Sequence, residues 1–552
     1  MTSRAFHRHL ILAAAALMAI TAAAAGGTRA KSVGARCWQD VRVLADDSMA
    51  GRFAGTPGHR RAAEFVAEAF RKARLEPGAD GSFFQPVNLQ TRQVIEANSS
   101  LALIVDGKSK ALTLGDDAIV SLRGNYAPKV EAPMVFAGYG LHLPQYGIDD
   151  LAGLDLKGKV VVAINAAPKG IPGAAAAHFG SAAERWKVYR AAGAVGAVFV
   201  PNPHMMDLPW ERIALTRHEP SMVLLDSEDR FAGQQLWVQF NPARFSVLLE
   251  GTSHRAEDIF ALVKDQEPLP RFALAARVSA TMDVSVGTLT SENVIGVLRG
   301  SDPALRDEYV VLSAHLDHLG IASEGQGDAR GDRLFNGAMD NASGVAVLMQ
   351  IARDLGQQKA PRRSVVFAAV TAEEMGLLGS RAYVERARTR NMRIVANLNT
   401  DMFLPLYPMR QLVVYGLEES ELGDDARAVA GQMKIGVQTD PQPLRNRFIR
   451  SDQYSFIREG IPSLATKVGF EAGSADAEIE RQWLAQRYHG VSDAPDQPVD
   501  LAAVGTYAEL IKRLGVRIAN RATPPRWLDS SVFAQLASHG SESAQPRTPA
   551  AR

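Results

Sequence analysis

Side chains that could bind a metal ion stand where predicted strands end or helices begin in the second half of the chain. Five residues share this setting: His315 after the apolar run 309–314, Asp340 before a helix predicted at 344–355, Glu373 and Glu374 after the run 364–370, and Asp401 after the run 394–399. Each one alone also fits a simpler structural position, such as a helix N-cap or an acidic turn. Because ligands of open α/β sheets bind outside the carboxyl ends of the strands, the set predicts one site at one sheet edge.

The residue types indicate which metal such a site would hold. The chain has one cysteine, Cys37, so a zinc site made of four cysteines is excluded. Histidine nitrogens and carboxylate oxygens are ligands that zinc accepts. Between residues 284 and 521 the histidines are His315, His318 and His489. His489 lies in the loop-like stretch 487–493, so we expect it to be the last ligand.

Hydrolysis is the chemistry that these residues could perform. One carboxylate shared by two cations holds them about 3.5–4 Å apart, so that both act on one carbonyl and one water. Asp340 suits the shared position. In the adjacent pair Glu373 and Glu374, one carboxylate would coordinate, and the other would take the proton of the attacking water and return it to the leaving amine. Asp317 could accept the second ring N–H of His315 and fix its tautomer.

With these residues in view, the chain resembles peptidase family M28, the co-catalytic zinc aminopeptidase-like group, with an inserted protease-associated (PA) domain. Beyond the site, the resemblance rests on the segments 44–47, 51–52, 55–58, 291–296, 450–456 and 460–462, and for the PA domain on the glycine-containing segments 135–140, 155–160 and 191–197. It implies two zinc ions per chain, the first held by His315, Asp340 and Asp401, and the second by Asp340, Glu374 and His489. It also implies that Glu373 is the general base and that Tyr488 helps to stabilise the tetrahedral intermediate.

The sequence departs from the family pattern in two places. Thr400 stands before Asp401 where many members have an apolar residue. The loop after His489 reads 490–493 Gly-Val-Ser-Asp, where many relatives carry a Thr/Ser-Pro pair. Both metal ligands are kept, so we expect metal binding to be kept as well.

The pattern of apolar residues predicts the elements that position these side chains. Apolar residues at helical spacing predict one amphipathic helix over Gly58–Leu75, which Pro77 and Gly78 end. From residue 291 onward, strands and helices alternate. This alternation predicts an α/β fold with a mostly parallel, doubly wound sheet and helices on both faces. Short β-rich runs between about 98 and 283 predict a second, β-rich inserted domain.

The predicted organisation has five parts: a signal peptide at 1–30, the N-terminal part of the peptidase domain at 31–97, the PA-like insertion at 98–283, the catalytic domain at 284–521 and a flexible tail at 522–552. The signal peptide is indicated by Arg4, His7 and Arg8, which precede the apolar run Leu10–Ala25. This run is shorter than the roughly 20 residues of a spanning helix. We therefore expect export to the periplasm or the cell exterior, without stable membrane insertion once the signal is removed.

Composition excludes several classes of function. With 46% hydrophobic and 22% charged residues the sequence is that of a globular protein and not of a disordered chain. The net charge of +1 (61 basic minus 60 acidic residues) gives no electrostatic reason to expect nucleic acid as a partner. Peptide substrates are the expected partners, and the sequence leaves the oligomeric state open.

The predicted function is that of an exported di-zinc exopeptidase, most simply an aminopeptidase. Carboxypeptidase or dipeptidase action stays open, because the choice of chain end depends on pocket residues, for which Phe403, Arg450 and Tyr454 are candidates. A non-catalytic, receptor-like protein would have lost at least one site residue, and none is missing. A glutaminyl cyclase-like transferase with one zinc is disfavoured, because such relatives lack the Asp340-Asn341 pattern.

Overall fold

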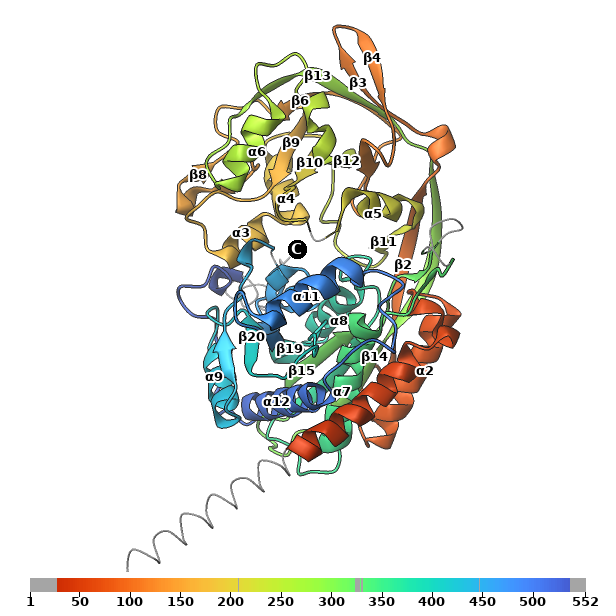
Figure 1. The fold of residues 1–552 in the computed structure, drawn as a ribbon, viewed down its shortest axis with the longest axis vertical. Coiled ribbons are helices and arrows are strands. Elements are labelled where there is room, and N and C mark those ends of the chain that lie inside the picture. The colour runs from red at the N-terminus through yellow and green to blue at the C-terminus, as the bar shows by residue number, and fades with distance from the viewer. Residues whose placement is uncertain (1–26, 207, 323–327, 329–330, 446, 537–552) are drawn as a thin grey trace, which may run out of the picture.

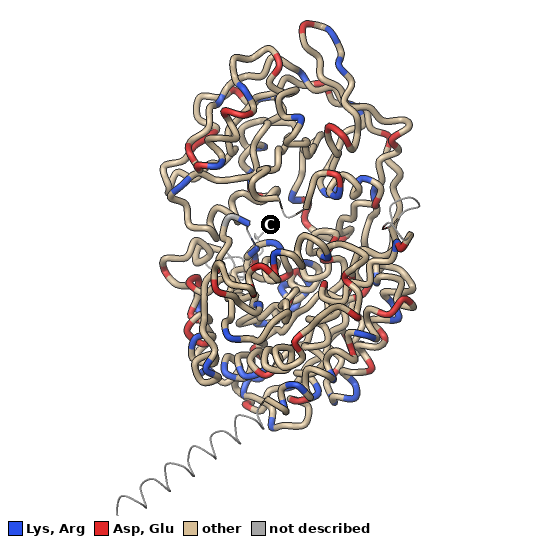
Figure 2. The backbone as a smooth tube through the Cα atoms, in the orientation of Figure 1, with Lys and Arg blue, Asp and Glu red and all other residues tan. Residues whose placement is uncertain are grey.

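The computed structural model describes residues 27–206, 208–322, 328, 331–445 and 447–536. Figure 1 shows two parts stacked along the long axis, each built around its own large sheet. Lys and Arg residues are interspersed with Asp and Glu residues in both parts (Figure 2), in keeping with the small net charge.

The first sheet has ten strands and carries the predicted site. Across the sheet they lie in the order β11 (Ser221–Leu224), β2 (Phe84–Val94), β14 (Val284–Leu298), β18 (Ser364–Val370), β15 (Glu308–His315), β19 (Arg393–Asn399), β22 (Ser463–Gly469), β20 (Gln411–Tyr415) and β21 (Gly436–Gln438), and β1 (Glu76–Pro77) pairs with β14. The four central strands β18, β15, β19 and β22 are parallel to one another.

The prediction of a mostly parallel sheet is therefore correct for this centre and for the edge pair β20 and β21. β14 is antiparallel to both of its neighbours, β2 and β18, and β20 is antiparallel to β22. The chain leaves the first sheet along β2 and returns to it along β14, so these two adjacent strands must run in opposite directions. The fold is a mixed α/β fold.

Helices cover both faces of the first sheet, as predicted. Alternate residues of β15 point to opposite faces. Val310 and Leu312 pack into one large core together with α2 (Pro57–Lys72), α7 (Ser343–Leu355), α9 (Leu422–Gln432) and α12 (Leu501–Ala519). Val311 packs on the opposite side with α8 (Leu378–Thr389) and α10 (Gln453–Arg458). The helix predicted over Gly58–Leu75 is confirmed as α2.

The second sheet has eight strands, all from the predicted insertion. They lie in the order β4 (Lys108–Leu112), β3 (Ser100–Val105), β13 (Phe272–Thr281), β6 (Lys129–Phe136), β9 (Val160–Asn165), β10 (Gly196–Pro201), β12 (Leu236–Phe240) and β5 (Ala118–Val120). α6 (Ala256–Lys264) packs into the core on one face, and α4 (Ala182–Ala191) packs on the other through Trp186 and Tyr189. The short helices α3 (Gly173–Phe179) and α5 (Trp210–Leu215) also belong to this part.

The two parts are joined by strand pairing as well as by the segments of the chain that run between them. β14 pairs with β2 along the whole length of β2, from Phe84 opposite Val294 to Val94 opposite Val284. In addition, β11 lies within the predicted insertion, yet it pairs with β2 at the edge of the first sheet. The segment before β11 thus runs from the second sheet to the edge of the first sheet.

The C-terminal segment differs from the flexible tail predicted for residues 522–552. Trp527 and Phe533 are buried, and the indole N–H of Trp527 donates to the Gly460 carbonyl at 2.8 Å. These two aromatic side chains are part of a buried apolar cluster, so residues 522–536 pack against the rest of the molecule. Residues 537–552 lie outside the described residues.

Residues 27–44 form a helix that packs on α12. The approach is close, because a Cβ added to Gly505 would lie 1.9 Å from the Ala30 carbonyl oxygen. The remainder of the predicted signal peptide, residues 1–26, lies outside the described residues. Among the described residues, no helix has the length and apolar character needed to cross a membrane.

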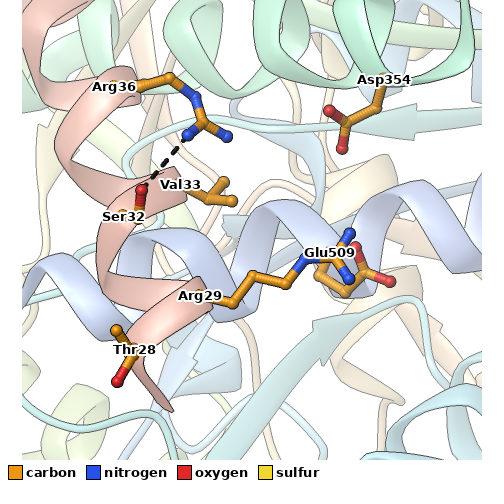
Figure 3. Close-up of a pocket in the computed structure, with 7 residues that line it drawn as sticks. All are labelled: Thr28, Arg29, Ser32, Val33, Arg36, Asp354 and Glu509. Carbon is orange, nitrogen blue, oxygen red and sulfur yellow. Dashed lines mark hydrogen bonds between the residues drawn. The ribbon is translucent and has the colours of Figure 1, made fainter. Parts of the chain in front are cut away.

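A cavity of about 570 Å³ lies beneath this N-terminal helix (Figure 3). Its lining is Thr28, Arg29, Ser32, Val33, Arg36, Asp354 and Glu509. Asp354 lies at the C-terminal end of α7, whereas Asp340 precedes the N-terminal end, so roughly 20 Å of helix separates the cavity from the predicted site at 1.5 Å per residue.

Candidate metal centre

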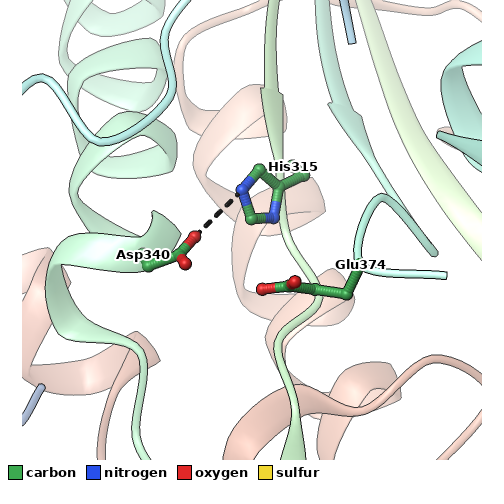
Figure 4. A group of neighbouring side chains, drawn as sticks. All are labelled: His315, Asp340 and Glu374. Atoms are coloured by element: carbon green, nitrogen blue, oxygen red, sulfur yellow. Dashed lines mark ion pairs between the residues drawn. The ribbon is translucent and has the colours of Figure 1, made fainter. Parts of the chain in front are cut away.

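Asp340 lies at the centre of the predicted site, and its two oxygens face different histidines. Oδ1 is 3.2 Å from His315 Nε2, and Oδ2 is 3.2 Å from His489 Nε2. Each histidine nitrogen also faces a second carboxylate: His315 Nε2 is 3.2 Å from Asp401 Oδ1, and His489 Nε2 is 3.3 Å from Glu374 Oε2. Figure 4 shows His315, Asp340 and Glu374 converging from three separate segments. The structure thus brings together all five residues predicted as ligands.

The parallel centre of the sheet explains this convergence. His315 is the last residue of β15, Glu374 follows β18, and Asp401 follows β19, so three neighbouring strands deliver side chains at one edge. Asp340 lies in the turn just before α7, where its peptide bond to Asn341 is cis. His489 lies three residues after the end of α11 (Ala475–Gln486).

The donor set fits zinc. The ligand atoms of His315, Asp340 and Glu374 all lie within 4.8 Å of one another. Each half of the site offers one imidazole nitrogen and two carboxylate oxygens, with the Asp340 carboxylate common to both halves. This is the nitrogen and oxygen chemistry of catalytic zinc sites, which keep a coordination position for water or substrate.

The electrostatics of the site separate the two adjacent glutamates. Although burial opposes it, the charge of His489 and hydrogen bonds from histidines lower the pKa of Glu374 to about 2. Burial raises the pKa of Glu373 well above its usual range, and the neighbouring carboxylates of Glu374 and Asp401 add to this effect. Glu374 is therefore suited to be an ionised ligand, and Glu373 to be a proton acceptor.

Asp317 has a different contact from the one predicted. Its carboxylate lies 3.9 Å from His315 Nδ1, and the closer acceptor for that ring nitrogen is the Asp317 backbone carbonyl, at 3.2 Å. The carboxylate instead accepts the backbone N–H groups of Glu373 (3.1 Å) and Glu374 (3.3 Å). The turn after β18 brings two backbone donors to this buried carboxylate, so Asp317 holds the glutamate pair in place.

His318 belongs to the site, although the sequence reasoning did not include it. Its ring is fully buried, and Nδ1 lies 2.8 Å from Glu374 Oε1 and 4.0 Å from Asp340 Oδ2. Because a carboxylate can only accept, Nδ1 must carry the proton, and His318 donates to Glu374. Glu374 is thus held by one oxygen, while its other oxygen faces His489. The signal was present in the sequence as the second histidine of the string 315–318.

Arg52 is a second residue that was missed. Its guanidinium is fully buried and donates to four carbonyl oxygens, those of Leu44 (2.7 Å), Leu316 (2.8 Å), Asn336 (2.7 Å) and Gly337 (2.8 Å). Leu316 follows His315, and Gly337 precedes the Asp340 turn. Arg52 therefore ties the N-terminal segment to the loop after His315 and to the turn before Asp340, two of the segments that carry predicted ligands.

Asp493 joins the His489 loop to the Asp340 turn. Its buried carboxylate accepts the backbone N–H groups of Met339 (2.9 Å) and Asp340 (3.0 Å). It also accepts a hydrogen bond from the Gln497 side chain. Asp493 is the last residue of the segment 490–493, where the sequence departs from the family pattern, and its carboxylate positions the Asp340 turn.

The helix that precedes His489 is anchored by a buried ion pair. Glu480 of α11 pairs with Lys467 of β22, and both side chains are only 3% exposed. The Tyr407 hydroxyl donates to the second Glu480 oxygen at 3.1 Å. Movement of α11, and with it His489, would break this pair.

Two of the three predicted pocket residues lie elsewhere. Phe403 is fully buried and stacks on Tyr507 at 4.2 Å between ring centroids, so it is a core residue. Tyr454 is buried, and its hydroxyl lies 2.9 Å from Nδ1 of His178 in α3, so it contacts the second part of the molecule. Aromatic residues near ligands look like pocket residues in a sequence, but these two have core and interdomain partners. Arg450 is exposed, and its charge lies close to Tyr488.

Tyr488 lies beside the site. Its ring packs on the His489 ring, with 4.0 Å between centroids, and on the core of the first sheet. Its backbone carbonyl accepts a hydrogen bond from Arg212 of α5 at 3.1 Å.

The fold and this donor set define a candidate metal centre at the parallel edge of a mixed α/β sheet. Residues 293–514 match the model of peptidase family M28, and this segment contains every residue of the donor set.

Three known proteins illustrate what the chain is similar to. Aminopeptidase NAALADL1 of Mus musculus is 34% identical over 143 residues, which cover 25% of this chain and 17% of that protein. A probable glutamate carboxypeptidase of Arabidopsis thaliana, LAMP1, is 40% identical over 115 residues, covering 20% and 14% of the two chains. The aligned segments thus span less than a fifth of these relatives. The solved structure of an aminopeptidase from Aneurinibacillus sp. strain AM-1 covers 92% of this chain and 98% of its own, with a TM-score of 0.51 and 17% identity, and this likeness concerns the fold.

Proposed function

We propose that the protein is a di-zinc metallo-exopeptidase, an aminopeptidase that removes N-terminal residues from peptides. The observation that carries the proposal is the division of the Asp340 carboxylate between His315 and His489, each of which faces one further carboxylate. One zinc would be held by His315, Asp340 and Asp401. The other would be held by Asp340, Glu374 and His489.

The chain's own residues support peptide hydrolysis at this place. Zinc, when bound, polarises a carbonyl oxygen and makes a water molecule more acidic. Glu373 lies next to the proposed ligand Glu374, and its raised pKa makes it the more basic of the two glutamates, so it can accept the proton of the attacking water and return it to the leaving amine. Asp317 holds the backbone of Glu373 and so fixes the position of this base.

Two further parts of the proposal concern the whole chain. We infer export, on the basis of the charged and apolar pattern of residues 1–30. We also infer that residues 98–283 form a PA domain. In support, Gly138, Gly158 and Gly193 in its glycine-containing segments have φ values of +61°, +68° and +83°, a backbone region that favours glycine.

Carboxypeptidase action is a second candidate. Arg450 is exposed, its charge counteracts the burial that raises the pKa of Tyr488, and its guanidinium could pair with a substrate carboxylate. A relative named as a probable glutamate carboxypeptidase is consistent with this alternative.

One experiment tests both candidates. The purified protein is analysed for zinc and is assayed on aminoacyl p-nitroanilides, on their N-acetylated forms and on N-blocked dipeptides. About two zinc ions per chain and cleavage that requires a free amine would support the aminopeptidase. Cleavage of N-blocked dipeptides would favour the carboxypeptidase. Absence of zinc, together with no hydrolysis after zinc is restored, would contradict both.

A further inference from the structure

Two arginines of the second part of the molecule bind backbone carbonyl oxygens in the loops that carry Glu374 and His489. Arg123, which follows β5, donates from Nη2 to the Glu374 carbonyl at 2.8 Å. Arg212 of α5 donates from Nη1 to the carbonyl of Tyr488, the residue before His489, at 3.1 Å. Both loops of this half of the candidate metal centre are thus contacted by guanidinium groups from beyond the first sheet.

Each of these contacts fixes a proposed ligand through a peptide plane. A peptide group is planar, so the Tyr488 carbonyl lies in one plane with the Cα atom of His489, and the Glu374 carbonyl lies in one plane with its own Cα atom. His489 also has a φ of +50°, in the left-handed region that residues with a Cβ atom seldom adopt and that neighbouring contacts must maintain. A guanidinium that holds one of these carbonyls therefore limits the movement of the side chain that would bind zinc.

The segments that carry the two arginines are themselves held by β2. Arg92 of β2 donates to the carbonyl of Gly124, the residue after Arg123, at 2.6 Å. Gln93 of β2 donates to the carbonyl of Arg217, which follows α5, at 2.7 Å. Because β2 lies in the first sheet and pairs with β14, both arginines are attached through short segments to the strand pair that joins the two parts of the molecule.

The other half of the candidate metal centre is held by residues outside the predicted insertion. Arg52 donates to the carbonyl of Leu316, directly after the proposed ligand His315, at 2.8 Å. The side-chain amide of Asn341 donates to the carbonyl of Thr400, directly before the other proposed ligand of this half, at 2.9 Å. Loosening the contact between the two parts of the molecule should therefore affect the two halves to different degrees.

We propose that Arg123 and Arg212 are positioning residues, through which the contact between the two parts of the molecule sets the zinc affinity of the Glu374 and His489 half. The inference rests on the proposed di-zinc function and adds a means of regulating it. Because coupling between two equilibria is reciprocal, the contact between the parts must tighten by the same factor when this half is filled. A condition that separates the two parts would then release one zinc ion before the other.

Zinc affinity gives the first test, by titration of the apoprotein against a chromogenic chelator. In Arg123→Met and in Arg212→Met, one zinc dissociation constant should rise about tenfold, as expected for losing one hydrogen bond from a charged group, and the other should change less than about threefold. Adding Asp401→Asn assigns the constants, because it should weaken the half that Arg123 and Arg212 do not contact. The double arginine variant should show a rise of about 100-fold, because the two contacts lie on separate loops.

Two further variants separate positioning from a general effect on the fold. Arg123→Lys keeps a cationic donor and should recover part of the zinc affinity. The matched control is Arg277→Met, because Arg277 pairs with Glu131 within the second sheet, at 3.2 Å. This control should match the wild type in both zinc dissociation constants.

Amide hydrogen exchange tests the reciprocal effect and does not depend on turnover. In the wild type, zinc should slow the exchange of residues 120–125 and 210–219, and the double arginine variant should lose this protection. Unchanged zinc dissociation constants in the double variant would overturn the inference. Equal losses in both halves together with a lower urea midpoint would also overturn it, because they indicate general destabilisation. If the wild type binds no zinc, the proposed function and the inference both fail; if zinc binds and the variants behave as expected but no peptide is cleaved, only the proposed function fails.

Discussion

Replacing His318 with leucine should weaken zinc binding on the Glu374 side of the site. The fully buried His318 ring donates from Nδ1 to Glu374 Oε1 at 2.8 Å, while Oε2 faces His489 at 3.3 Å. A hydrogen bond to a charged group contributes about 1.5–3 kcal/mol. At about 1.4 kcal/mol per tenfold change, this corresponds to a dissociation constant about 10–150-fold higher. The range agrees with the roughly 10–100-fold expected when a group that orients a metal ligand is lost.

The assay is a titration of the apoprotein with zinc in competition with a chromogenic chelator, which resolves two dissociation constants. In His318→Leu the zinc dissociation constant of the half that contains Glu374 and His489 should rise. The dissociation constant of the His315 half should change less than about threefold. His318→Asn places an amide nitrogen near the position of Nδ1 and should recover most of the affinity. Two unchanged constants in His318→Leu would refute the reasoning. Equal losses in both variants would show that the ring's bulk, and not its hydrogen bond, supports the site.

Four further predictions follow from contacts described above. Glu373→Gln should keep the zinc content and lower kcat by about two to four orders of magnitude, the loss expected for a general base; full activity in steady-state assays would remove Glu373 from the reaction. Arg52→Lys should lower the free energy of unfolding by about 3–6 kcal/mol, because an ammonium group replaces about two of the four carbonyl contacts; an unchanged urea midpoint would contradict this. Lys467→Met should cost about 3–5 kcal/mol by leaving Glu480 buried and unpaired, and adding Glu480→Leu should recover most of this in the same urea assay. Burial lowers the pKa of His178 to about 4, so between about pH 6.5 and pH 4 the unfolded chain binds one more proton, and about 3 kcal/mol of stability is lost as pH falls; His178→Phe should flatten this slope, and equal slopes would refute the assignment.

The sequence predicted the elements around the site because their apolar periodicity is strong. α2, β15, β18 and β19 begin and end within a few residues of their predicted bounds. Apolar periodicity does not predict, however, whether a strand runs parallel or antiparallel to its neighbours. The antiparallel setting of β14 follows from the path of the chain through the second sheet, which local pattern cannot reveal.

The residues that meet at the candidate metal centre could be predicted because each stands at or near the end of an element, where the type of side chain is unusual. The residues that hold them could not. The guanidinium of Arg52 donates its hydrogen bonds to backbone carbonyl oxygens. Because every residue has a backbone carbonyl, the sequence pattern cannot identify these acceptors. Phe403 and Tyr454 were assigned to a pocket in error, because stacking on Tyr507 and contact with His178 depend on tertiary neighbours.

The pairing of β2 with β14 also sets an order on folding. Phe84 of β2 pairs with Val294 of β14, so β2 lacks this neighbour until the whole second part of the molecule has left the ribosome. Loop-closure entropy grows only slowly with length, so the cost in stability is modest, but such distant pairing slows folding. During synthesis, the apolar faces of β2 and of the helix α2 stay exposed to water until β14 has been made. Chaperone dependence and sensitivity to the rate of translation should therefore concentrate in this first segment of the chain.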